Sequence, residues 1–250
     1  MNYYNENDPK AAAWLRELIK DGHISEGVVD ERSIVDVQPD ELVRYRQCHF
    51  FAGIGGWSYA LRLAGVPDDE PIWTGSCPCQ PFSNAGLQLG TADERHLWPI
   101  FFNLIRECGP ATVFGEQVAS KAGRSWLAGV FADLEGVAYA AAGADLCAAG
   151  VGAPHIRQRL FWVANPNPNS DRLQTVSDEG SVCFSPHDRK RTRRFGEMGS
   201  APFWISPCPP GARAVVLGNG VYGEVDMLRG YGNAIVPQVA EVFIRAYYDV

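Results

Sequence analysis

Apolar residues recur along this chain at two periods, and the alternation between the periods predicts an α/β fold. The first helix is marked by local signals, because Asp8 can cap it, Pro9 suits its first position and Gly22 can end it. Its predicted apolar stripe is Ala13, Leu15, Leu18 and Ile19. A second amphipathic helix is predicted from Trp57 to Ala64, where Gly65 and Pro67 stop it.

Short buried strands alternate with further helices. The predicted strands cover residues 46–51, 71–75, 111–116, 138–146 and 159–164. The other predicted helices cover residues 91–108, opened by a Thr91–Glu94 capping box, and 125–135, with a last helix from Pro237 that places Val239, Val242, Phe243 and Ala246 on one face. Strands that alternate with helices predict a doubly wound, mostly parallel, Rossmann-like sheet.

Composition divides the chain after Ala164. Residues 165–210 are rich in Asn, Pro, Ser and Arg and lack a sustained period, whereas order returns at Val215. We therefore expect a main α/β domain over residues 1–164, a short loop-rich insertion over 165–214, and a return to the main domain over 215–250.

Charge and cysteine content narrow the setting. The 250 residues carry a net charge of −7, which argues mildly against nucleic acid, yet five basic residues cluster within 189–194. That cluster suits either phosphate contact or a solvated loop. Seven cysteines without framework spacing favour a reducing cytoplasm. No signal-peptide pattern and no apolar run of membrane-spanning length is found, so we expect a cytoplasmic protein without a membrane partner.

Three reactive candidates follow predicted strands. They are the glycine turn after Phe51, Cys79 and Glu116. In a doubly wound sheet such positions gather beyond the carboxyl ends of the strands, where ligands bind. Taken singly, each has a plainer reading as a tight connection, a buried inert thiol or a surface carboxylate.

Five segments in order resemble the motifs of the cytosine-5 DNA methyltransferases. They are Phe51-Ala52-Gly53-Ile54-Gly55-Gly56, Pro78-Cys79-Gln80-Pro81-Phe82-Ser83, Gly115-Glu116-Gln117-Val118, Pro154-His155-Ile156-Arg157-Gln158-Arg159 and Gly232-Asn233-Ala234-Ile235-Val236-Pro237. Two substitutions depart from the family pattern, Gln117 for Asn and His155 for Gln. The family's penultimate motif has no clear copy before Gly232.

The resemblance implies methyl transfer from S-adenosylmethionine to carbon 5 of a flipped-out cytosine in double-stranded DNA. Cys79 would be the nucleophile, since a thiolate adding to carbon 6 makes carbon 5 reactive toward a sulfonium methyl. Glu116 would stabilise charge on ring nitrogen 3 as a general acid. Arg157 and Arg159, which can only donate, would bind the base carbonyl and the intermediate.

The same resemblance assigns binding residues. The cofactor would contact Phe51, Gly53, Ile54, Gly55, Gly56, Pro78, Asn233, Ala234 and Ile235. DNA would contact Gln80 and Ser83, with Arg189, Lys190, Arg191, Arg193 and Arg194 on phosphates, and residues 165–214 would form a short target-recognition segment. Cys77 with Cys79 could suggest zinc, but no second pair at finger spacing accompanies them, so no metal is expected.

Other readings remain open at this point. The chain could be a catalytically silent homologue that binds DNA or the cofactor, although the presence of Cys79, Glu116, Arg157 and Arg159 counts against silence. It could instead act on transfer RNA, as a divergent branch of the family does. A restriction endonuclease partner is suggested only by the compact size.

The first 46 residues suggest a permuted order. The family has two strands between its glycine motif and its Cys motif, but here only residues 57–78 separate them. Residues 28–37 resemble the family's adenine-side segment, with Ser33-Ile34 at the Asp-Ile positions. The hypothesis places Ile34 on the adenine ring, Ser33 or Asp36 at its polar edge and Asp30 on the ribose. Alternatively, the segment only covers a sheet edge.

Overall fold

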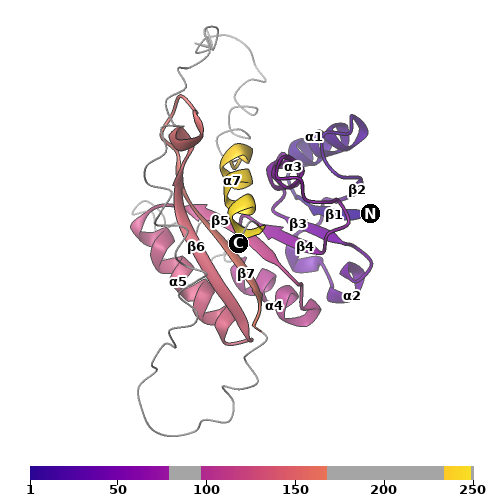
Figure 1. Ribbon diagram of the computed structural model, residues 1–250. Helices are drawn as coiled ribbons and strands as arrows, with labels where there is room; N and C mark the ends of the chain where they lie inside the picture. The colour runs from indigo at the N-terminus through magenta and orange to yellow at the C-terminus, as the bar shows by residue number, and fades with distance from the viewer. Residues whose placement is uncertain (79–96, 168–233, 249–250) are drawn as a thin grey trace, which may run out of the picture.

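The computed structural model describes residues 1–78, 97–167 and 234–248, which form one sheet between two layers of helices (Figure 1). The described strands are β1 (Asn2–Asn5), β2 (Gly27–Asp30), β3 (Gln47–Phe50), β4 (Ile72–Gly75), β5 (Val113–Val118), β6 (Tyr139–Cys147) and β7 (Gln158–Pro166). Within this part of the chain they form a seven-stranded sheet in the order β2-β1-β3-β4-β5-β7-β6. The first five strands in that order are parallel, whereas β7 runs antiparallel to both of its neighbours. The predicted doubly wound, mostly parallel α/β fold is confirmed.

Helices cover both faces of the sheet (Figure 1). The described helices are α1 (Pro9–Lys20), α2 (Pro39–Leu42), α3 (Gly56–Leu63), α4 (Trp98–Cys108), α5 (Lys121–Glu135) and α7 (Pro237–Tyr248), with short 3-10 turns η1 (Ile34–Asp36) and η3 (Ala148–Val151). Successive residues of a strand point their side chains to opposite faces of the sheet, so they pack against different helix layers. Trp162 packs in the core beneath α2, α4 and α5, whereas Phe161 and Val163 pack in the core beneath α3 and α7.

Helix α1 forms where its capping signals predict it. The Asp8 carboxylate accepts hydrogen bonds from the backbone N–H groups of Lys10 and Ala11, at 2.8 and 3.2 Å. The predicted stripe is displaced at one position, because Ala12 is buried and Ala13 is exposed.

The predicted face of α7 is wrong at two of its four positions. Val239 and Phe243 are buried, but Val242 and Ala246 are not, and Ala240 and Ile244 are buried in their place. The helix lies in a layer beside α3 and over the sheet, so two adjacent rows of its residues are covered rather than one.

Some element boundaries also differ from prediction. Helix α5 begins at Lys121 instead of residue 125, because the Ser120 hydroxyl caps it by accepting from the Gly123 N–H at 2.9 Å. Helix α4 begins at Trp98, and the predicted Thr91–Glu94 capping pair lies outside the described residues. Strand β5 continues two residues past Glu116, to Val118.

Strand β1 was not predicted, because its sequence is polar at both ends. All four of its residues are buried, and it lies between β2 and β3. Both polar groups of the Asn2 side chain are hydrogen-bonded. The amide donates to the carbonyl of Asp68 at 2.9 Å, and the oxygen accepts from the backbone N–H of Gln47 at 3.0 Å. The Tyr4 hydroxyl contacts the hydroxyls of Ser25 and Ser58 at 2.6 and 2.9 Å. Residues 1–46 therefore contribute two parallel strands beside β3, on the side opposite β4.

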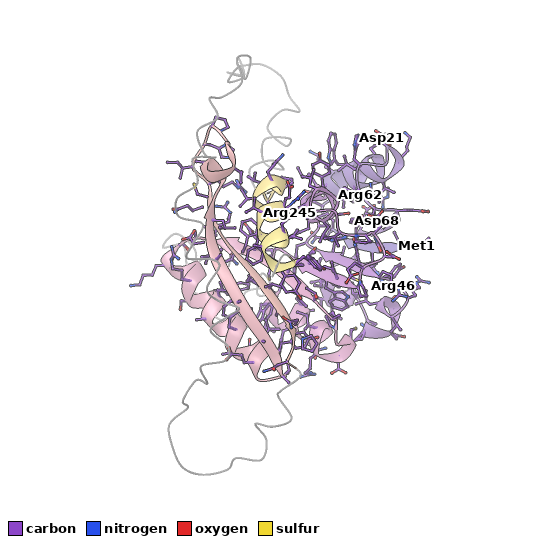
Figure 2. The ribbon with its side chains drawn as sticks, in the orientation of Figure 1. Met1, Asp21, Arg46, Arg62, Asp68 and Arg245 are labelled. Atoms are coloured by element: carbon purple, nitrogen blue, oxygen red, sulfur yellow. The ribbon has the colours of Figure 1, made fainter. Side chains whose placement is uncertain are left out.

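Two arginines connect the last helix to the N-terminal half of the chain through hydrogen bonds and an ion pair (Figure 2). Arg245 of α7 donates to the carbonyl of Leu63, at the end of α3, at 2.8 Å. Arg62 of α3 pairs with Asp68 at 2.6 Å and donates to the carbonyl of Gly22, beyond α1, at 2.6 Å. These contacts join α7, α3 and the α1 end into one layer.

Candidate active site

Four neighbouring parallel strands end at the same edge of the sheet, and their carboxyl ends bring the candidate residues together. Glu6 follows β1, the turn 51–55 follows β3, and the turn 76–78 follows β4. Glu116 lies near the end of β5. This is the edge at which doubly wound sheets bind ligands. The structure thus brings the glycine motif, the approach to Cys79 and Glu116 to one place.

The glycine turn has the backbone of a close-approach site. Gly53 and Gly55 adopt left-handed φ values of 56° and 78°. Phe51 does so as well, at 52°, which is an uncommon conformation for an aromatic residue and a feature of functional turns. Among the described residues, no atom lies within 4 Å of the place that a Cβ on Gly53 would take, so this side of the turn has room for a ligand. Gly56, by contrast, is closely covered, because a Cβ there would lie 2.7 Å from the Ile235 side chain.

Glu6 is a residue of this turn that the sequence analysis missed. One carboxylate oxygen accepts from the Gly53 N–H at 2.7 Å, and the other accepts from the Asp8 N–H at 2.9 Å. Each oxygen keeps a second lone pair for another donor. The signal that could have found Glu6 is its place directly after a strand, but β1 itself was not predicted.

Glu116 is buried beside two arginines. Its carboxylate lies 2.7 Å from the Arg159 guanidinium, and only 9% of its side chain is exposed. In the β5–β7 ladder Arg159 lies opposite Val118, so it is the diagonal neighbour of Glu116. Burial raises the pKa of Glu116 to about 7, although the charges of Arg159 and Arg157 act in the opposite direction. A carboxyl group with that pKa can hold or release a proton at neutral pH.

Arg157 connects this acid to the C-terminal segment. Its guanidinium donates to the carbonyl of Ala234 at 2.6 Å, and burial lowers its pKa. Ile235 packs on Gly56, so the segment before α7 reaches the glycine turn as the last motif implies. His155 is exposed, close to Arg157 in the chain.

Two side chains hold the turn of residues 76–78, which precedes Cys79 in the sequence, through hydrogen bonds. The indole N–H of Trp57 donates to the Ser76 hydroxyl at 3.0 Å. The Gln117 amide donates to the carbonyl of Cys77 at 3.3 Å, while its oxygen accepts from the Val118 N–H at 2.8 Å. Gln117 thus keeps a turn-holding contact in place of the family's Asn. Pro78 is exposed and is the last described residue of this turn.

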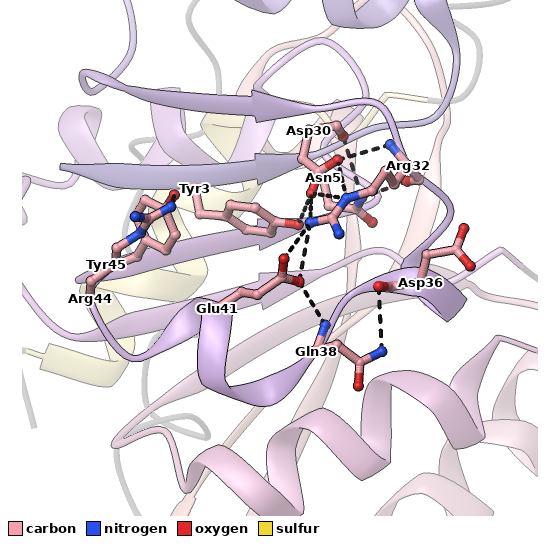
Figure 3. A network of polar contacts seen from close by, with 9 residues as sticks. All are labelled: Tyr3, Asn5, Asp30, Arg32, Asp36, Gln38, Glu41, Arg44 and Tyr45. Carbon is pink, nitrogen blue, oxygen red and sulfur yellow. Dashed lines mark hydrogen bonds and ion pairs between the residues drawn. The ribbon is translucent and has the colours of Figure 1, made fainter.

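Two of the predicted adenine-side residues, Asp30 at the end of β2 and Asp36, belong to a polar network (Figure 3). Both Asp30 oxygens are engaged, since Arg32 donates to each of them and the Tyr3 hydroxyl donates to one at 2.7 Å. Arg32 also pairs with Glu41 at 3.1 Å. Ile34 is 3% exposed and packs in the core, which leaves it little surface for a ring, whereas Asp36 is exposed. The network fixes this segment, and the Asp30 carbonyl accepts from the Glu6 N–H at 3.0 Å.

A cavity of about 440 Å³ adjoins the glycine turn on its helix side. Its wall includes four predicted cofactor residues, Ile54, Gly56, Ala234 and Ile235, together with Arg157. The remaining wall comes from α1, α3 and the segment after α1, namely Trp14, Leu18, His23, Ile24 and Tyr59, and from His155, Val236 and Pro237. The predicted cofactor residues therefore lie on both sides of the turn, with Phe51 and Gly53 outside this cavity.

Several predicted residues lie outside the described part of the chain. They are Cys79, Gln80, Ser83, Arg189, Lys190, Arg191, Arg193, Arg194 and Asn233, together with nearly all of the predicted 165–214 insertion. Among the described residues, no group of three His, Cys, Asp or Glu side chains could hold a metal ion. In the same residues no helix is long and apolar enough to cross a membrane.

Comparison with known proteins bears on the motifs that meet at this edge. The family model of the C-5 cytosine-specific DNA methylases matches residues 66–194, just over half of the chain. The chain belongs to this family. The five motifs in the sequence predicted a member of this family, and that prediction is confirmed.

Curated relatives of this chain include type II methyltransferases. M.NgoMIV of Neisseria gonorrhoeae is 32% identical over 127 residues, covering 44% of this chain and 40% of that protein. M.AplI of Arthrospira platensis is 38% identical over 104 residues, covering 41% of this chain and 29% of that protein. This chain thus matches less than half the length of either relative.

Solved structures similar to this chain include a mutant of Spodoptera frugiperda DNMT2. It aligns with a TM-score of 0.43 and 14% identity over 67% of this chain and 50% of that one. A putative DNA modification methyltransferase from an Escherichia coli prophage aligns with a TM-score of 0.40 and 16% identity over 71% of this chain and 49% of that one.

Proposed function

We propose that this family member transfers a methyl group from S-adenosylmethionine to carbon 5 of cytosine in double-stranded DNA, with Cys79 as the covalent nucleophile. The observation that carries the proposal is Glu116, a buried carboxyl group whose pKa is raised to about 7 and which faces Arg159 at 2.7 Å. An acid of this kind suits a reaction that builds negative charge on a ring nitrogen of the base.

The residues divide the chemistry between them. The Cys79 thiolate adds to carbon 6 of the flipped base, and protonated Glu116 donates to ring nitrogen 3 as charge builds there. The Arg159 guanidinium donates hydrogen bonds to the base carbonyl and stabilises the negative charge on the ring. Bound S-adenosylmethionine supplies an electrophilic methyl group on a sulfonium centre. Transfer leaves S-adenosylhomocysteine. Water or hydroxide then takes the carbon 5 proton, the Cys79 thiolate is expelled from carbon 6, and ring nitrogen 3 returns its proton to Glu116, which regenerates both residues.

The cofactor fits the glycine-turn edge. Gly53 presents open space and Glu6 keeps free lone pairs beside it, which suits the hydroxyl groups of a ribose. In this proposal Glu6 takes the ribose role first given to Asp30, because each Asp30 oxygen already accepts at least two hydrogen bonds, from Arg32 and, at one oxygen, from Tyr3. Strands β1 and β2 would thus supply the cofactor side in a permuted order, with Ile34, Ser33 and Asp36 still candidates for the adenine.

Calorimetry tests the ribose assignment. Glu6→Gln is expected to weaken S-adenosylmethionine binding about tenfold, since a charge-assisted hydrogen bond contributes roughly 1.5–3 kcal/mol. Glu31→Gln is the matched control, because Glu31 is an exposed carboxylate that pairs with Arg16. Equal affinities for the Glu6 and Glu31 variants would remove Glu6 from the cofactor site.

Base-resolution mapping tests the reaction itself. We expect DNA from cells that express the wild-type chain to carry 5-methylcytosine at a defined sequence, and DNA from cells that express Cys79→Ser to carry none. Transfer RNA from the same cells is mapped in parallel. Methylation confined to RNA would overturn the DNA assignment, and absence of methylation from both would favour a silent homologue.

A further inference from the structure

Trp57 is a buried indole placed between the glycine turn and the turn that leads to Cys79. It is the second residue of α3, directly after Gly56, and 4% of it is exposed. Its ring stacks on Phe114 at 6.0 Å between centroids and meets Phe161 edge to face at 5.9 Å. Phe161 is the ladder partner of Glu116, so Trp57 packs against the strands that carry the acid.

The apolar packing of Trp57 needs only a ring, but its indole N–H also has a partner. That N–H donates to the Ser76 hydroxyl at 3.0 Å, and Ser76 is the first residue after β4. A buried indole N–H normally finds such a partner. Here the acceptor belongs to the turn that continues through Cys77 and Pro78 to Cys79.

The second tie to the same turn comes from Gln117, on the strand that carries Glu116. Its amide donates to the carbonyl of Cys77 at 3.3 Å. The turn is thus connected to the cofactor-side helix through Ser76 and to the acid-bearing strand through Cys77. Two contacts on adjacent residues, from two different elements, hold residues 76 and 77, which precede Cys79 in the sequence.

We propose that Trp57 is a positioning residue: through Ser76 it sets the place of the Cys79 turn relative to the glycine turn. The inference rests on the proposed function, since it assumes that a nucleophile and a methyl donor must be aligned at this edge. Alignment of reacting groups is worth large factors in rate, and a displacement of about 1 Å can cost roughly 100-fold. A contact that only stabilised the fold would not affect the nucleophile turn selectively.

Three variants separate positioning from stability. Trp57→Phe keeps a ring in the core and removes the donor, and Ser76→Ala removes the acceptor. Ser76→Thr keeps the hydroxyl and serves as the conservative rescue. The matched control is Trp98→Phe, because Trp98 is also 4% exposed and also loses one indole hydrogen bond, to Asp133 at 2.7 Å between α4 and α5.

The experiment measures methyl transfer and, separately, the rate at which iodoacetamide alkylates Cys79, followed by peptide mass spectrometry without DNA. For Trp57→Phe and Ser76→Ala we expect kcat to fall about tenfold, with KM for S-adenosylmethionine within twofold of wild type, and the alkylation rate to change at least threefold. The double variant should be no worse than either single one, because both remove the same contact. Ser76→Thr and Trp98→Phe should stay close to wild type.

Two results would overturn the inference. One is a Trp57→Phe protein whose kcat and alkylation rate match those of Trp98→Phe. The other is a defect in the double variant equal to the product of the single defects. If wild type itself transfers no methyl group, the proposed function fails, and the alkylation rates alone then decide whether Trp57 positions the Cys79 turn.

Discussion

Asp30 and Glu116 are both carboxylates paired with an arginine, at opposite halves of one sheet edge, and their pKa values shift in opposite directions. Burial alone would raise the pKa of Asp30, but hydrogen bonds from Arg32 and Tyr3 outweigh it and lower the pKa. For Glu116 burial prevails over Arg159 and Arg157, and the pKa rises to about 7.

The difference lies in how each pair is solvated and hydrogen-bonded. Arg32 has 47% of its side chain exposed and makes several hydrogen bonds to Asp30, so that pair acts as a structural connection. The side chains of Arg159 and Glu116 are only 20% and 9% exposed. The same two chemical groups therefore give a carboxylate that is held ionised at Asp30 and one whose protonated form persists to about neutral pH at Glu116.

Exchanging each carboxylate for its amide should have very unequal effects on methyl transfer. Glu116→Gln is expected to lower kcat by about 100-fold or more, since general acid catalysis contributes roughly 10²–10⁴. Asp30→Asn should change kcat by less than about threefold, because Asp30 does not reach the base. Single-turnover transfer of a labelled methyl group measures both. Similar losses for the two variants would mean that Glu116 has no special role.

The pH profile sharpens the same contrast. Glu116 acts in its protonated form, which is lost as pH rises through about 7. The slope of log(kcat/KM) against pH should therefore decrease by one near pH 7, whatever the pKa of the Cys79 thiol. Residual activity of Glu116→Gln should lack that bend, while Asp30→Asn keeps it. A bend that persists in Glu116→Gln must come from another group.

Stability should depend on pH for one carboxylate and not for the other. The folded pKa of Glu116 lies above its ordinary value of 4.5, so folding takes up a proton between about 4.5 and 7 and stability falls as pH rises through that window. Relative to wild type, Glu116→Gln should gain roughly 1–3 kcal/mol between pH 5 and pH 8.

Asp30 provides the control for this measurement. Its folded pKa is lowered, so its contribution is complete above its ordinary value of 3.8 and is lost only as pH falls further. Asp30→Asn should cost about 1 kcal/mol at both pH 5 and pH 8, because the pair is partly exposed. Urea unfolding at the two pH values measures both variants, and a pH-independent Glu116→Gln difference would contradict the raised pKa.

The sequence predicted the parts of the fold that depend on local signals. The Asp8–Pro9 start of α1 and the strand-to-turn order around Phe51 follow from capping and glycine chemistry over a few residues. The antiparallel direction of β7 was not predicted, because a strand's own residues do not encode the direction of its neighbour. The buried face of α7 depends on α3 and the sheet, so Val242 and Ala246 were misplaced.

Strand β1 shows most clearly what a hydropathy pattern does not predict. Asn2 and Asn5 are buried, but they are satisfied by side-chain hydrogen bonds to residues distant in the chain, such as Asp68 and Arg32. A hydropathy pattern does not register such partners, so the strand was missed, and with it Glu6. Glu116, by contrast, was found through its motif, although its raised pKa needed the surrounding burial to be seen.

Covalent trapping tests the central claim most directly. DNA with 5-fluorocytosine at the methylated position is incubated with the protein and S-adenosylmethionine, and intact mass is measured after denaturation. Fluorine cannot leave as a proton does, so wild type should form a stable protein–DNA adduct that maps to Cys79, while Cys79→Ser should form none. A wild-type protein that methylates DNA without any adduct, or an adduct that maps to another residue, would contradict the account.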